Sequence, residues 1–129
     1  MRALFQAIMA KFQGSALDTA ISSNMYLMEA PEDVALPYAV YMLQSDISDY
    51  TFDDTHNEIE LIFIINSDEG KAEEVCDNLE LLEALYDDCK LSVTGYRFIG
   101  MERIEVQLLH DPGEEWQYMI RYKIQLEKV

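Results

Sequence analysis

Potential metal ligands gather in one short stretch of the chain. Asp53, Asp54, His56 and Glu58 supply carboxylate oxygens and an imidazole nitrogen, which are groups that divalent cations bind. The stretch lacks the glycine and the ligand register of an EF-hand loop. The two histidines and two cysteines of the chain are widely separated, whereas a zinc site needs three or four converging ligands. We therefore expect weak, adventitious cation binding at most, and no cofactor.

Side chains that could act as nucleophiles are present, but their spacing does not predict catalysis. Ser45 and Ser48 precede His56 without a nucleophile-elbow motif. Cys76 falls on the apolar stripe of a predicted helix, so we expect it in the core rather than exposed. The five glycines are isolated, and no phosphate-binding loop is present. The sequence thus predicts a protein that is not an enzyme, with Cys76 and Cys89 as reduced thiols of a cytosolic protein.

The chain is strongly and unevenly acidic. Its formal net charge is -16, and residues 29–88 contain 18 of the 25 acidic residues but only one base, Lys71. Residues 89–129 are balanced, with six acids and six bases. Such a chain repels phosphate and would forgo the counterion release that drives binding to DNA. We expect no sequence-specific nucleic acid partner, and no membrane partner because no stretch approaches the roughly 20 apolar residues of a membrane span.

Hydrophobic periodicity predicts an α+β fold, with residues 1–129 forming one domain. The elements expected, in order, are helices over 2–12 and 16–22, a short strand at 25–28, a strand at 38–45, a polar loop or hairpin tip over 46–57, a strand at 58–66, a helix from an N-cap at Ser67 to about Asp87, and a hairpin of strands around 103–108 and 116–127. We expect a mixed or antiparallel sheet of four to five strands. One main amphipathic helix packs on one face of it, and an N-terminal helix precedes it.

Three patterns indicate which side chains enter the core. The main helix has an apolar stripe at helical spacing, formed by Ala72, Val75, Cys76, Leu79, Leu82 and Tyr86. The last strand alternates cleanly, with the even-numbered residues from Trp116 to Leu126 on the core side. Residues 58–66 are almost continuously apolar. That strand is therefore covered on both faces, or covered on one face and used at an interface on the other.

The order of elements resembles the small tail-completion, or tail-terminator, proteins of long-tailed bacteriophages. The similarity covers roughly residues 3–127. The segments that carry it are Leu36-Pro37-Tyr38-Ala39-Val40-Tyr41, Tyr50-Thr51-Phe52, Ile59 to Ser67, Asp87-Asp88-Cys89, Val93-Thr94-Gly95-Tyr96-Arg97 and Trp116-Gln117-Tyr118. They are matches of pattern and placement, without a catalytic fingerprint.

The resemblance implies a role in assembly. Proteins of this family form a ring, commonly of six subunits, on the head-proximal end of the finished tail tube. The ring ends tube polymerisation and forms part of the head–tail joint. The expected partners are copies of the same chain, the tail tube protein and a head–tail connector or neck protein. The expected location is the virion tail or neck, and the host cytoplasm during assembly. No residue of the family is catalytic, so none is transferred.

A closed ring uses two different patches on each subunit, and the uneven charge could supply them. We predict that bases of the C-terminal segment meet acids of a neighbouring subunit. The residues of this predicted interface are Arg97, Arg103, Arg121 and Lys123, with Asp49, Asp53 and Asp54. Three alternatives stay open. They are an acidic DNA mimic that inhibits a host nucleic-acid-binding protein, another neck or tube component, and a small enzyme.

Overall fold

The computed structural model describes residues 2–50, 55–68, 70–110 and 115–129, and shows an α+β fold. Its elements are α1 (Arg2–Phe12), α2 (Ala16–Ala20), β1 (Met25–Leu27), β2 (Tyr38–Tyr50), β3 (Thr55–Ser67), α3 (Ala72–Tyr86), β4 (Tyr96–Leu109) and β5 (Trp116–Lys128). The predicted fold class is confirmed, including the N-terminal helix and the short strand near residue 25.

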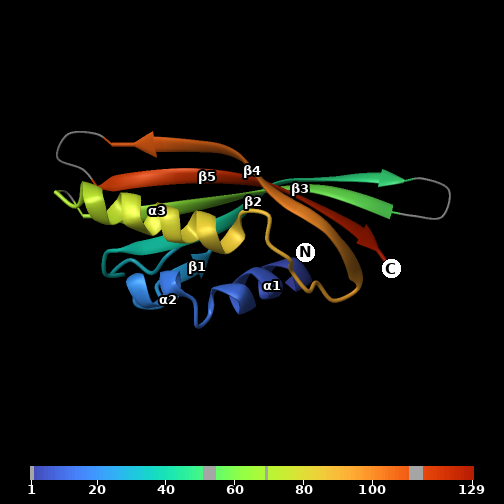
Figure 1. The fold of residues 1–129 in the computed structure, drawn as a ribbon, viewed down its shortest axis with the longest axis horizontal. Helices are drawn as coiled ribbons and strands as arrows, with labels where there is room; N and C mark the ends of the chain where they lie inside the picture. The colour runs from blue at the N-terminus through green and yellow to red at the C-terminus, as the bar shows by residue number, and fades with distance from the viewer. Residues whose placement is uncertain (1, 51–54, 69, 111–114) are drawn as a thin grey trace.

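The five strands form one mixed sheet in the order β1-β2-β3-β5-β4. β1 runs parallel to β2, and the remaining neighbours are antiparallel. The predicted hairpin of the last two strands is present, with β4 on the edge of the sheet. Figure 1 shows the end of β2 and the end of β4 directed toward opposite ends of the long axis.

The core lies between one face of the sheet and the three helices (Figure 1). Alternate residues of β3 and β5 fill it, and the following side chains are at most 8% exposed: Ile59, Leu61, Phe63, Ile65, Ile120, Tyr122, Ile124 and Leu126. The helices contribute Leu4, Ile8 and Phe12 from α1, Leu17 from α2, and Val75, Leu79, Leu82 and Tyr86 from α3. The period-two pattern of β5 therefore predicted its buried face correctly.

Local signals explain where several elements begin and end. Gly14 follows α1 with a φ of +81°, a conformation that glycine adopts without steric cost. Ser15 caps α2 by accepting a hydrogen bond from the backbone N–H of Asp18. Gly95, with a φ of +85°, makes the turn into β4. At Gly100 the pairing register of β4 shifts, as expected for a strand bend.

Two predicted boundaries are wrong. β2 continues past residue 45 to Tyr50, and β3 begins at Thr55 rather than at residue 58, so the pairing favours the hairpin over the loop for residues 46–57. Backbone pairing of the two strands continues there without an apolar alternation to reveal it. Ser67 is not the N-cap of α3. It ends β3 and is fully buried, while Lys71 occupies the N-cap position without a side-chain hydrogen bond.

The prediction that Cys76 is a core residue is also wrong. Cys76 is exposed, and Cys89 is half-buried. α3 is rotated so that Asn78, rather than Cys76, joins Val75, Leu79 and Leu82 on the buried face. Spacing alone allowed either position, because residues 76 and 78 flank the stripe on opposite sides.

Candidate interaction surfaces

Each of the four predicted interface bases has an acidic partner in its own chain. Arg97 pairs with Glu127, and Arg121 pairs with Glu105. Lys123 Nζ lies 2.9 Å from Glu58 Oε1. This hydrogen bond and the charge of Glu58 raise the pKa of Lys123. These three pairs lie on the sheet face opposite the helices, where they join neighbouring strands.

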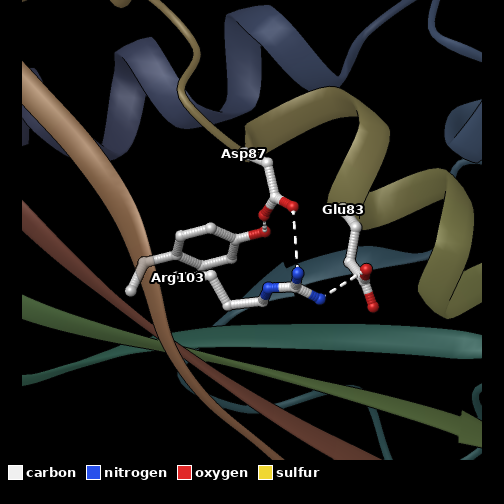
Figure 2. A network of polar contacts seen from close by, with 4 residues as sticks. Glu83, Asp87 and Arg103 are labelled. Atoms are coloured by element: carbon white, nitrogen blue, oxygen red, sulfur yellow. Dashed lines mark hydrogen bonds and ion pairs between the residues drawn. The ribbon is translucent and has the colours of Figure 1, made fainter.

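Arg103 lies on the helix side of β4 and belongs to a different network. Figure 2 shows its guanidinium directed toward Glu83 and Asp87 of the α3 end. The Arg103 Nη2 to Asp87 Oδ2 distance is 3.5 Å. Asp87 also accepts a 2.6 Å hydrogen bond from the Tyr122 hydroxyl. The guanidinium of Arg103 and the hydroxyl of Tyr122 thus offset the unfavourable interaction between the Asp87 carboxylate and the negative end of α3.

The same network changes the acidity of a buried phenol. Burial raises the pKa of Tyr122, and its hydrogen bond to the Asp87 carboxylate raises it further. Tyr86, which is fully buried, has its pKa raised mainly by burial. Both phenols are therefore neutral at physiological pH, and they act as hydrogen-bond donors in the core.

Of the three predicted acidic residues, the structure describes only the backbone of Asp49. Asp49 is in β2, opposite His56 of β3 in the strand register. Asp53 and Asp54 lie outside the described residues. The register places Arg97 level with Asp49, through His56 and Glu127, and places Arg103, Arg121 and Lys123 nearer the middle of the sheet. The interface itself stays a prediction.

The outer face of the sheet, opposite the helices, is partly apolar. Val40, Met42, Ile62, Ile64 and Met119 lie on it by register. Val40 is buried and the other four are half-buried. A hollow of about 410 Å³ lies beside Val40, Met42 and Ile64, and residues 28–34 form part of its wall. β3 is therefore fully covered on its core face and only half-buried on the other, and its use at an interface stays a prediction.

Sequence reasoning missed the apolar side chains at the sheet edges. Val106 and Leu108 alternate as a core-facing strand would, yet they are 37% and 47% exposed. Their strand is an edge, and α3 packs over β3 and β5 instead. The alternation was visible in the sequence, but the position of the strand within the sheet was not.

The described residues offer little support for a metal centre. They contain no group of three or more histidine, cysteine or acidic side chains that could hold an ion. His110 stacks on Trp116, with ring centroids 3.6 Å apart and an interplanar angle of 5°.

In the part of the chain that the structure describes, no helix is long and apolar enough to cross a bilayer.

Comparison with known proteins finds a similar structure but no matching sequence. No protein-family model matches the chain, and no curated protein sequence matches it. Among solved structures, a chain described as "Virion of native gene transfer agent (GTA) particle" has a TM-score of 0.80 to this one. The sequences are 10% identical, and the match covers 95% of this chain and 92% of the other. The two chains therefore share a fold.

Proposed function

We propose that this chain is a structural, non-enzymatic virion protein that caps the head-proximal end of a tail tube. As the cap, it ends tube polymerisation and forms part of the head–tail joint. Its partners are then other copies of itself in a ring, commonly of six, the tail tube protein and a connector or neck protein. It acts in the virion tail or neck, and it is present in the host cytoplasm during assembly.

The observation that carries this proposal is the likeness in fold to a chain of a gene transfer agent virion. The likeness extends over nearly the whole of both chains, so it concerns the complete arrangement of sheet and helices. The sequence resemblance to tail-completion proteins is independent of it and covers roughly residues 3–127. The fold likeness supports a virion protein, and the resemblance adds the position at the end of the tube.

Charge and solubility fit such a role. A ring subunit must stay soluble until it docks, and a net charge of -16 keeps free copies apart. The bases Arg97, Arg103, Arg121 and Lys123 lie on β4 and β5, while Asp49 lies toward the far end of β2. We propose that these bases, together with Asp49, Asp53 and Asp54 of a neighbouring subunit, form the polar part of the ring contact.

The position in the particle can be tested by labelling. Val129 is 90% exposed, so a C-terminal affinity tag is accommodated without repacking. Particles from a host that produces the tagged chain are isolated, labelled with gold and viewed by electron microscopy. The proposal predicts one cluster of gold at the junction of head and tail, and untagged particles serve as the control.

Other label patterns would replace the proposal with a named rival. Gold along the whole tail would indicate a tube component. Gold on heads that lack tails would indicate a head-completion protein. A tagged chain absent from particles but bound to a basic host nucleic-acid-binding protein would indicate the acidic DNA mimic.

A further inference from the structure

Exposed large hydrophobic side chains lie at both edges of the sheet. Among the described side chains, and apart from the C-terminal Val129, two are at the β1 edge, Leu27 and Met28, and five are on β4, namely Ile99, Ile104, Val106, Leu108 and Leu109. Native proteins usually protect the edges of a sheet from pairing, and contiguous exposed apolar patches mark interaction sites. Two edges of one sheet thus carry surface suited to a partner.

At the β1 edge, the apolar surface is hollowed into a groove. The groove has a volume of about 510 Å³ and lies between α1 and the strands beside it. Phe5, Met9, Leu27 and Tyr41 line it with apolar surface, and Arg2 and Gln6 line it as well. We call these six residues the α1 groove.

At the opposite edge, exposed apolar side chains follow one another along β4. Ile104 is the extra residue of a β-bulge, where the register shifts between Arg103 and Glu105. Val106 and Leu108 follow it on the helix side of the sheet, paired with Ile120 and Tyr118 of β5. Ile104, Val106 and Leu108 form what we call the β4 strip. Figure 1 shows the end of β4 on the far side of β5 from α3, and α1 with β1 beyond α3.

The helices beside the groove and beside the strip differ in charge. Arg2 of α1 lines the groove, and α1 contains no acid. α3, on the strip side, contains five acids and no base. One of them, Glu83, pairs with Arg103 of β4 and contributes to the raised pKa of Tyr118, whose strand partner is Leu108. An apolar groove lined by Arg2 and an apolar strip beside the acids of α3 are complementary in both respects.

We propose that the β4 strip of one subunit packs into the α1 groove of the next. The occupant of each surface is therefore a second copy of this chain. The contact joins two different patches on opposite edges, so it is heterologous and repeats head to tail. That such a repeat closes into a ring rests on the function proposed above. The strip and the groove supply the apolar centre of the contact, and the charged residues surround it.

Disulfide cross-linking in assembled particles tests the contact. Leu27→Cys is combined in turn with Ile104→Cys, Val106→Cys and Leu108→Cys, in a chain that carries Cys76→Ser and Cys89→Ser and a C-terminal tag. A disulfide needs Cβ atoms about 3.5–4.5 Å apart, so it reports direct contact. After mild oxidation of purified particles, we expect at least one pair to give a ladder of covalent multimers on a non-reducing gel.

Matched controls separate this contact from others. Gln107→Cys lies on the same strand but on the opposite face of the sheet, so Leu27→Cys with Gln107→Cys should give no ladder. Each single cysteine variant should also give none. Dimers formed by single variants as readily as by the pairs would overturn the proposal, because they would indicate a contact between identical edges.

Two further outcomes distinguish the failure of this inference from that of the proposed function. Tagged chain in the particles without any cross-linked pair would overturn the strip-and-groove contact and leave the virion role intact. Tagged chain absent from the particles for every variant and for the parent would overturn both.

Discussion

The hydroxyl of Tyr122 donates a hydrogen bond to Oδ1 of Asp87 across 2.6 Å, and this contact ties the end of α3 to β5. It joins residues 35 positions apart in the chain. Asp87 also meets Arg103, so three elements of the fold converge at one carboxylate (Figure 2). The helix layer and the sheet are therefore held in register by a polar contact as well as by the apolar core.

Removing the Tyr122 hydroxyl should measurably destabilise the protein. Tyr122→Phe keeps the buried ring but removes the donor to a charged acceptor, and Asp87 retains Arg103. We expect the free energy of unfolding to fall by about 1–2 kcal/mol. Tyr118→Phe is the control, since the Tyr118 hydroxyl makes a 3.6 Å contact with the exposed Cys76. Removing it should lower the free energy of unfolding by less than about 0.5 kcal/mol. Equal losses in urea unfolding of the two variants would contradict this account.

Stability should decline above about pH 10. The pKa values of Tyr86 and Tyr122 are raised above the ordinary value of 10.0, mainly by burial. Above that pH the unfolded chain releases these phenolic protons while the folded chain keeps them. The unfolded state then binds fewer protons, and the free energy of unfolding falls as pH rises. Urea unfolding between pH 9 and about 11 should show this slope, and it should be shallower in Tyr86→Phe and Tyr122→Phe. A slope unchanged in both variants would exclude this cause.

Adjacent residues of β3 should differ sharply in what they contribute to stability. Phe63 is fully buried and stacks on Tyr86 at a centroid distance of 4.7 Å. Phe63→Ala should cost about 3–5 kcal/mol through lost burial and a cavity. Ile64 is half-buried on the outer face, so Ile64→Ala should cost clearly less. Similar shifts in the urea midpoint of the two variants would mean that the two faces of β3 are buried alike.

Reversing two bases of β5 should prevent assembly. Arg121→Glu with Lys123→Glu places like charges beside Glu105 and Glu58, and it removes the bases proposed to meet a neighbour. We expect the tagged double variant to be lost from particles. Lys71→Glu with Lys90→Glu makes the same change in net charge at exposed positions off the sheet and should be incorporated normally.

The reversal has a control for folding. The variant must first unfold cooperatively in urea, so that a loss of assembly is not a loss of fold. Incorporation of the folded Arg121 and Lys123 variant at the level of the parent chain would refute the role of these bases in the ring.

The sequence predicted elements well where burial imposes a period. The stripe of α3 and the alternation of β5 follow from packing against a core. They predicted the fold class and the pairing of the last two strands correctly. Prediction failed where backbone pairing continues without burial. Asp46 and His56 continue β2 and β3 as strands although neither has an apolar pattern around it. Cys76 was wrongly predicted to be buried because the spacing of the stripe is compatible with either Cys76 or Asn78 at its margin.

The interaction surfaces depend on facts that a single sequence does not contain. Val106 and Leu108 have the pattern of core residues, and only the strand order makes them an exposed edge. Leu27 and Phe5 are far from them in the chain, and their groove exists only once α1 and β1 are side by side. The sequence shows the charges of Arg121 and Lys123, but it does not show that each pairs with an acid on a neighbouring strand of the same chain.

Electron microscopy of particles from the producing host with this gene deleted tests whether this chain ends the tail tube. If it does, the tails are overlong or variable in length and are not attached to filled heads, and particles are normal when the gene is restored. Tails of normal length on heads in the deletion strain would contradict the claim, and finished heads without any tails would assign the chain to the tube instead.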